Sequence, residues 1–192
     1  YVLTGKRAAW LSRGEIREML HDGIIELGSH SVRHRKYRVS KPRLSEIPYH
    51  WAYAPYRQLG ETPVPVLAPE LAGPICRGES PSCYKETTEQ FIFRVEQELR
   101  QSREALEALS GGPITALAWP WGAYCRAGQR AAQAAGFELL FTTKRGAVRK
   151  GSNPLAISRL EVRPHKGLSW FSNRMTIYSQ SQFASLYSRI RL

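Results

Sequence analysis

The pair His30 and His34 is the feature of this 192-residue sequence that most directly suggests chemistry. Two imidazoles four residues apart can meet on one side of a tight turn and offer two nitrogen ligands to a divalent metal. They lie in a polar cluster, residues 29–34, which follows a short apolar run at 24–27. The same spacing also occurs among ordinary surface or core histidines. The spacing alone therefore leaves a metal site and two structural histidines as alternatives.

Aromatic residues gather in two other places. Trp119, Trp121 and Tyr124 surround a turn, where they could form an apolar binding surface or fill the core. A second group could line a groove or merely anchor a loop, and it consists of Tyr49, Trp51, Tyr53 and Tyr56. Both alternatives stay open for each group.

A helix and a strand are predicted to position the histidines. Ser12 and Glu15 form a capping-box pattern, and the helical period that follows ends at Gly23, so a helix is expected over residues 12–21. Residues 24–27 form a short β-prone run. The cluster at 29–34 then falls at the C-terminal end of a strand, where α/β folds place ligand and catalytic groups.

The rest of the chain alternates predicted strands and helices. A long amphipathic helix opens at Thr88 and is closed by Gly111, and its inward face is expected to hold Phe91, Val95, Leu99, Ser102, Leu106 and Leu109. Strands are predicted at 114–119, 137–142 and 155–162, and a helix at 126–135. A final amphipathic helix is indicated by the spacing of Phe183, Leu186, Tyr187 and Ile190. This alternation predicts an α/β domain with a mostly parallel sheet, interrupted by an irregular Pro-rich insertion at 42–81.

The composition fits one ordinary domain, with 28 Lys and Arg, 16 Asp and Glu and a net charge of +12. No apolar run approaches the ~18 to 20 residues that would span a bilayer. Residues 144–192 carry ten basic residues and one acid, Glu161. Such a patch attracts an anionic polymer or a membrane surface, although scattered basic residues on a solvated surface are the commoner explanation. The basic residues follow no recognised nucleic-acid motif.

The three cysteines, Cys76, Cys83 and Cys125, are too few for a disulfide framework and contain no CxxC pair. Cys76 and Cys83 could bridge a small loop in an oxidising compartment. The sequence leaves this pairing open.

The string Glu26-Leu27-Gly28-Ser29-His30-Ser31-Val32-Arg33-His34 resembles the metal-binding motif of the polysaccharide deacetylases, the NodB-homology family of carbohydrate esterases. Three later segments resemble further motifs of this family in the same order, and they lie at 116–124, 135–143 and 157–162. The Trp-Pro-Trp-Gly variant of the second motif looks most like the poly-N-acetylglucosamine deacetylases of bacterial biofilm export.

The resemblance implies a NodB-type distorted (β/α) barrel over residues 1–192, incomplete at its N-terminus and carrying an insertion at about 38–86. It implies metal-dependent hydrolysis of N-acetyl groups from a polysaccharide that contains N-acetylglucosamine, in the periplasm or at the cell surface. His30 and His34 would hold Zn²⁺ or a similar divalent ion, and the backbone N–H of Trp121 would bind the oxyanion. Ser29 or Glu26 could support the ligands. The sugar would contact Trp119, Trp121 and Tyr124.

Three departures from the family pattern matter. The Asp-Asp motif that supplies the base and the third ligand is expected before Tyr1 and is absent, since the only aspartate is Asp22. The arginine of the later motif is replaced by Ala118. The candidate for the general acid is His165, outside the usual Leu-x-His context, and a surface loop histidine is its alternative role. A non-catalytic module that binds a glycan or an anionic surface is therefore the rival hypothesis, and the 192-residue chain alone is expected to be nearly inactive.

Overall fold

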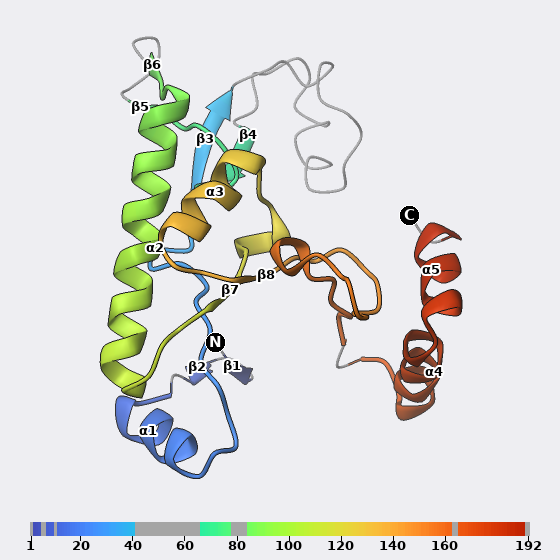
Figure 1. Cartoon of the computed structure of the whole chain (residues 1–192). Coiled ribbons are helices and arrows are strands. Elements are labelled where there is room, and N and C mark those ends of the chain that lie inside the picture. The colour runs from blue at the N-terminus through green and yellow to red at the C-terminus, as the bar shows by residue number, and fades with distance from the viewer. Residues whose placement is uncertain are drawn as a thin grey trace.

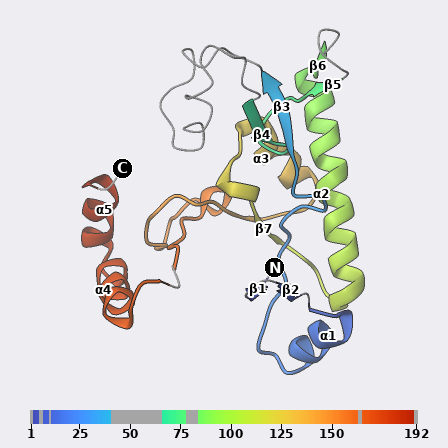
Figure 2. The same ribbon diagram turned by 180° about the vertical axis from the view of Figure 1, so that it is seen from behind.

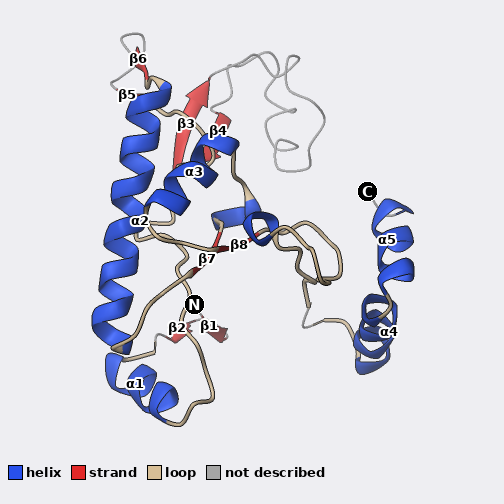
Figure 3. Cartoon of the chain, in the orientation of Figure 1, coloured by secondary structure: helices blue, strands red, loops and turns tan. Residues whose placement is uncertain are grey.

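The structure is a computed structural model that describes residues 2–4, 7–9, 11–40, 66–77, 84–162 and 165–190. Helices form most of its regular structure, and the strands are short (Figures 1 and 3). In chain order the elements are β1 (Val2–Thr4), β2 (Arg7–Ala9), α1 (Arg13–His21), β3 (Lys36–Ser40), β4 (Val66–Pro69), β5 (Cys76–Arg77), β6 (Tyr84–Lys85), α2 (Thr88–Ser110), β7 (Ala116–Ala118), η3 (Pro120–Gly122), α3 (Arg126–Ala134), β8 (Leu139–Phe141), η4 (Pro154–Ala156), α4 (Leu168–Ser179) and α5 (Ser181–Ile190).

The parallel pair β7 and β8 is the centre of the α/β arrangement. The two strands pair in register, with Leu117 opposite Leu140. Single parallel bridges add Ser29 beside β7 and Ile157 beside β8. The described residues thus place four chain segments side by side in one direction, as an α/β fold requires, but they do not close into the predicted barrel.

Two predicted strands are wrong in extent. Residues 24–27 form no strand, and only Ser29 joins the sheet, through hydrogen bonds of 2.8 Å with Ala116 O and Ala118 N. Ile24 is 74% exposed, whereas Leu27 at the other end of the run packs against the core without joining a strand. At 155–162 the structure has no strand. Pro154 begins the 3₁₀ turn η4, which takes residues 154–156 out of the sheet. After it, Ile157 forms a single bridge with Phe141, and Arg159 N donates to Lys144 O at 2.9 Å.

Helices α1, α2 and α3 confirm the sequence prediction because their ends are chemically defined. Ser12 and Glu15 form the expected capping box of α1. Thr87 and Gln90 form a second one at the start of α2, and Gly111 ends α2 in the left-handed conformation, with φ 73°. These caps satisfy backbone groups that a helix end otherwise leaves without partners.

The core lies between α2, α3 and the parallel pair. Figures 1 and 2 show α3 lying beside the long α2. Leu117 of β7 and Leu140 of β8 join residues of both helices in one buried cluster. The predicted inward face of α2 is confirmed at four positions, which are Phe91, Val95, Leu99 and Ser102. The buried cluster also includes Leu71, Ile114, Leu117, Trp119, Ala131, Ala132, Ala135, Phe137 and Leu140.

The predicted insertion is not wholly irregular. β3 pairs antiparallel with β4, and β5 pairs antiparallel with β6. The prolines permit this pairing because two-stranded ribbons accept proline at strand ends, as at Pro69, the last residue of β4. Residues 41–65 and 78–83, including Tyr49, Trp51, Tyr53 and Tyr56, lie outside the described residues.

The C-terminal region holds two helices. The predicted amphipathic helix is present as α5, whereas α4 was not predicted because it lacks a pronounced apolar face and buries no residue. Both helices lie on the far side of β8 from α2 in both views (Figures 1 and 2). Among the described helices, none combines the length and apolarity needed to cross a membrane.

Replacing Leu99 by Ala should lower the free energy of unfolding by about 2–5 kcal/mol, because Leu99 is fully buried in the core cluster. Phe93→Ala is the matched control on the same helix, since Phe93 is 67% exposed, and it should change stability by no more than about 0.5 kcal/mol. Urea unfolding of both variants measures the difference. Equal effects of the two substitutions would contradict the assignment of the buried face.

Candidate metal centre

The histidine loop, residues 29–34, starts from a buried serine. Ser29 is 1% exposed and its Oγ lies 2.7 Å from Ser102 Oγ on α2. The same oxygen accepts a hydrogen bond of 3.3 Å from the N–H of Ser31. Because Gly28 passes close to Ala116, where a side chain would meet its carbonyl oxygen at 3.3 Å, the loop lies tightly against β7. Ser29 thus ties the histidine loop to both β7 and α2.

Glu98 of α2 holds the middle of the histidine loop. Its Oε1 accepts hydrogen bonds from Val32 N at 2.9 Å and Arg33 N at 3.0 Å. Ser31 has a φ of 68° and His34 a φ of 48°, and Ser31 Oγ accepts a 2.9 Å hydrogen bond from His34 N. Non-glycine residues in this region cost about 1–3 kcal/mol each, so the surrounding hydrogen bonds must enforce the conformation. The loop therefore has a defined shape.

The two imidazoles lie next to each other at the C-terminal end of β7. Their ring centres are 4.7 Å apart and the ring planes are inclined by 45°. Two imidazoles on one tetrahedral Zn²⁺ place their ring centres roughly 5 Å apart, since each nitrogen lies about 2.0–2.1 Å from the metal. The observed separation fits a pair of ligands for one ion.

A backbone carbonyl fixes which nitrogen of His30 can bind a metal. His30 Nδ1 lies 2.7 Å from Ala118 O. A carbonyl oxygen only accepts, so Nδ1 must carry the proton and Nε2 keeps its lone pair. Metal-binding histidines commonly donate their other ring N–H in this way. His30 therefore has the protonation pattern of a ligand.

The surroundings of His34 favour its neutral form. Its pKa is lowered by burial first, then by the neighbouring His30, and to a lesser degree by the charge of Lys36. Its ring centre lies 4.0 Å from that of Trp121, and the Lys36 ammonium lies 4.5 Å from the centre of the Trp121 indole. A neutral imidazole is the form that binds a metal ion.

Trp121 brings a backbone N–H to the same place. It lies in the turn η3 with a φ of 54°, and Gly122 after it has a φ of 68° and packs against Thr143. Along the part of the chain that the structure describes, no oxygen accepts the Trp121 N–H. The indole ring is 42% exposed. This turn thus presents both an N–H donor and an aromatic ring beside the histidines.

Two buried carboxyl groups lie beneath the histidine loop. Glu98 and Glu70 are 5% and 3% exposed. Glu98 Oε2 lies 3.5 Å from Arg33 Nε, and within the described residues neither this oxygen nor Glu70 Oε1 accepts a hydrogen bond from an N–H group. The pKa of Glu70 is raised to about 7 by burial, then by the charge of Glu98 and a hydrogen bond to it, while Arg94 and Arg33 act in the opposite direction. A proton on Glu70 lets it donate to Glu98 and removes the repulsion between the two groups.

The structure brings His30, His34 and Trp121 together but separates the other predicted site residues from them. Trp119 is fully buried in the core, so of the two roles left open it has the structural one and offers no face to a sugar. Tyr124 stacks on Trp119 with ring centres 5.9 Å apart. His165 lies in an exposed turn before α4, and no contact among the described residues joins it to the histidine pair. Glu26 is exposed, so of the two residues predicted to support the ligands only Ser29 has hydrogen bonds that stabilise the loop.

Sequence reasoning missed Glu98 and Lys36. Glu98 is the one acid on the buried face of α2, and a charged residue in an apolar stripe signals a specific partner. Lys36 carries no such signal, because its place beside Trp121 depends on how β3 leaves the histidine loop.

The Glu70 proton should make stability depend on pH. The folded protein keeps this proton up to about pH 7, whereas an unfolded carboxyl loses it near its ordinary value of 4.5, so the free energy of unfolding should fall as the pH rises through this window. Glu70→Gln should match the native protein at the acidic end and become progressively more stable than it toward neutral pH. Urea unfolding across the window measures the difference. Glu104→Gln, on the exposed face of α2, is the control, and a similar gain there would contradict the assignment.

Comparison with known proteins agrees with this geometry. Residues 1–140 match the family model described as polysaccharide deacetylase. A de-N-acetylase from Aggregatibacter actinomycetemcomitans has a similar structure, with a TM-score of 0.63, 19% identity, and coverage of 85% of this chain and 53% of that one. For the BpsB deacetylase domain from Bordetella bronchiseptica the TM-score is 0.59 at 22% identity, with coverage of 78% and 48%.

A third similar structure is IcaB from Ammonifex degensii, with a TM-score of 0.50, 18% identity, and coverage of 90% of this chain and 52% of that one. At these identities the likeness shows the fold, and the chain spans about half the length of the three structures. No curated protein sequence matches it. Because the family model covers residues 1–140 of the 192, this chain belongs to the polysaccharide deacetylase family.

Proposed function

We propose that this chain carries part of the active site of a metal-dependent enzyme that removes N-acetyl groups from a polysaccharide containing N-acetylglucosamine. The observation that carries the proposal is the histidine pair, with ring centres 4.7 Å apart, beside the Trp121 turn. Both lie where β7 ends, the edge at which α/β folds gather their functional groups.

His30 and His34 would hold the divalent ion. The Ala118 carbonyl sets the tautomer of the neutral His30 ring, and burial lowers the pKa of His34, which favours the neutral form that binds a metal. When bound, an ion such as Zn²⁺ polarises the acetamido carbonyl and lowers the pKa of a water molecule.

Trp121 would act on the substrate in two ways. Its backbone N–H would donate to the carbonyl oxygen as negative charge develops there during hydrolysis. Its exposed indole would contact the apolar face of the sugar ring. The Lys36 ammonium above this indole adds a positive charge near the developing oxyanion.

The remaining catalytic groups are assigned by resemblance. Within the described residues no group of three His, Cys, Asp or Glu side chains could hold a metal ion. The family pattern assigns the third ligand and the general base to an Asp-Asp motif that would precede Tyr1. We therefore expect the 192-residue chain to bind metal weakly and to hydrolyse little substrate without those residues.

The substrate class rests on the relatives. The structures with similar folds include a de-N-acetylase and the BpsB deacetylase domain. The Trp-Pro-Trp-Gly segment at 119–122 resembles the subgroup that acts on poly-N-acetylglucosamine. A location in the periplasm or at the cell surface suits this substrate, and it also suits the disulfide at Cys76, since such bonds persist in oxidising compartments.

Metal binding by the 192-residue chain tests the histidine assignment. His30→Ala and His34→Ala should each weaken Zn²⁺ binding by ~100-fold or more, because loss of a ligand costs at least as much as loss of a group that supports one. His21→Ala is the matched control, since His21 is exposed at the end of α1. Titration with Zn²⁺, with circular dichroism to verify the fold, gives the readout. Equal Zn²⁺ binding by His30→Ala and His21→Ala would contradict the assignment of His30 as a metal ligand.

Acetate release from N-acetylglucosamine oligomers tests the reaction itself, in a protein that carries these 192 residues together with the Asp-Asp motif of the family. Hydrolysis should stop with a chelator and in His30→Ala, whereas Trp121→Ala should keep its metal but react more slowly, because the N–H survives and the ring is lost. Binding of the oligomers without acetate release would favour the rival hypothesis of a non-catalytic glycan-binding module. Strong hydrolysis by the 192-residue chain alone would show that the base has been assigned wrongly.

A further inference from the structure

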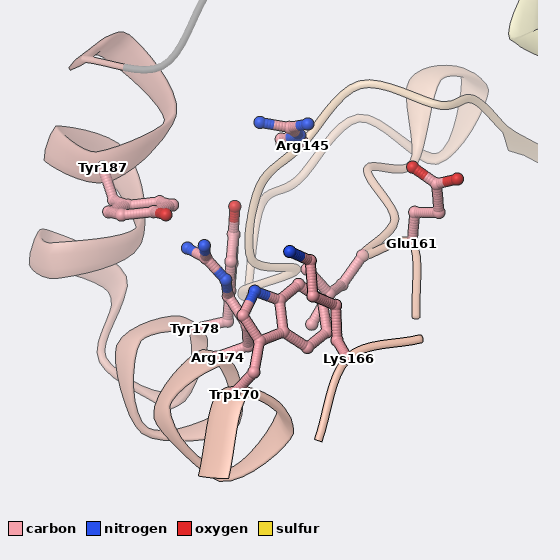
Figure 4. A pocket seen from close by; sticks show the side chains of 8 residues that line it. Arg145, Glu161, Lys166, Trp170, Arg174, Tyr178 and Tyr187 are labelled. Atoms are coloured by element: carbon pink, nitrogen blue, oxygen red, sulfur yellow. The ribbon is translucent and has the colours of Figure 1, made fainter. Parts of the chain in front are cut away.

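A second pocket lies away from the histidine pair, between α4, α5 and the loops that precede them (Figure 4). Its volume is about 320 Å³, within the range of small-ligand sites. The residues that give it chemical character are Arg145, Lys166, Trp170, Arg174, Tyr178 and Tyr187. None of them takes part in the candidate metal centre.

The pocket is strongly positive. Among the described residues of its wall, Arg145, Lys166 and Arg174 are positively charged and Glu161 is the one acid. Within the described residues neither Lys166 nor Arg174 forms a salt bridge with an acid. The charges of these two side chains are therefore available to a ligand.

Aromatic rings orient the arginine. The Arg174 guanidinium lies 4.4 Å from the centre of the Tyr187 ring and 5.1 Å from that of Trp170. Contacts of this kind hold a guanidinium without neutralising its charge. The indole and phenol rings also supply flat apolar surfaces next to the charge.

One polar atom in the pocket has no partner. Tyr178 Oη is buried and forms no hydrogen bond with the described residues. Its ring meets that of Tyr187 edge to face, with centres 6.3 Å apart, and its hydroxyl points toward the space between Tyr187 and Arg145 (Figure 4). A buried hydroxyl normally has a hydrogen-bond partner, and an anionic oxygen bound in the pocket would provide one.

We propose that this pocket binds an acidic sugar, with a carboxylate or phosphate group held by Arg174, Lys166 and the Tyr178 hydroxyl. Charged hydrogen bonds from a guanidinium are the strongest available to such a group. The ring of the sugar would lie against Trp170, since indoles offer an apolar face to sugars. The site would give this chain affinity for an acidic polysaccharide, independently of the histidine pair.

Calorimetric titration of the 192-residue chain tests the proposal with glucuronic acid, glucose 6-phosphate and neutral N-acetylglucosamine. At least one acidic sugar should bind ~10-fold or more tightly than the neutral one, with weaker binding as salt is added. Preference for glucuronic acid identifies a carboxylate ligand and preference for the sugar phosphate a phosphate ligand. Inorganic phosphate alone should bind more weakly than the preferred acidic sugar, because it lacks a ring to contact Trp170.

Arg174→Gln should weaken binding of the preferred acidic sugar by roughly tenfold or more, and Tyr178→Phe should weaken it by a smaller factor. Arg130→Gln is the matched control, because it removes the same charge from the exposed face of α3. His30→Ala should leave binding unchanged, so failure of this proposal is distinguishable from failure of the proposed hydrolysis. Equal binding of acidic and neutral sugars, or equal losses in Arg174→Gln and Arg130→Gln, would overturn the proposal.

Discussion

The carboxylate of Glu98 is the contact on which the candidate metal centre depends. It lies on the buried face of α2 yet directs one oxygen at two consecutive backbone N–H groups of the histidine loop. Without that acceptor, two N–H groups would lose their partner, which costs about 1–3 kcal/mol for each group left buried. The loop would also lose the contact that balances the positive φ of Ser31 and His34. A helix that builds the core thereby shapes the loop that carries the chemistry.

The same carboxylate imposes a constraint on the layer beneath it. Glu98 shares its buried space with Glu70, and Glu70 follows directly after β4. Arg94 secures this segment, because its guanidinium pairs with both oxygens of Glu86 at 2.8 and 2.9 Å and donates to the Glu70 carbonyl at 2.9 Å. Arg94 of α2 therefore holds the segment predicted as an insertion at two points, Glu70 and Glu86, where the chain returns to the core. The buried face of α2 therefore contributes apolar side chains to the core, and through Glu98 it also fixes the shape of the histidine loop.

The sequence predicted the parts of the fold whose ends are marked by local chemistry. Capping residues at Ser12 and Thr87 and the glycine at 111 define α1 and α2, and these helices need no distant partner to be recognised. The predictions of strands at 24–27 and 155–162 were wrong for the opposite reason. A strand exists only where a neighbour completes its hydrogen bonds, and there the described chain offers single contacts at Ser29 and Ile157. The sequence pattern did not predict the helix α4, because this helix has no pronounced apolar face.

For the site, spacing predicted that His30 and His34 could meet, and the family motif added Trp121. The sequence could not show two features that prepare these histidines to bind a metal. One is the hydrogen bond from His30 to the carbonyl of Ala118, 88 residues away, and the other is the left-handed backbone at Ser31 and His34. Both features arise from tertiary contacts. The role of Trp119 was equally undetermined, since a tryptophan next to a turn can face either side of a sheet until the core is assembled.

Lys36 has a consequence for the end of the proposed reaction. The substrate amide is neutral, whereas the product is an amine that takes up a proton and becomes a cation. The Lys36 ammonium, 4.5 Å from the Trp121 ring centre, lies beside the place where that cation would form. Lys36 is exposed, so water weakens its repulsion of a nearby cation without abolishing it. The lysine would therefore favour departure of the deacetylated sugar over its retention, so that the enzyme is inhibited less by its own product.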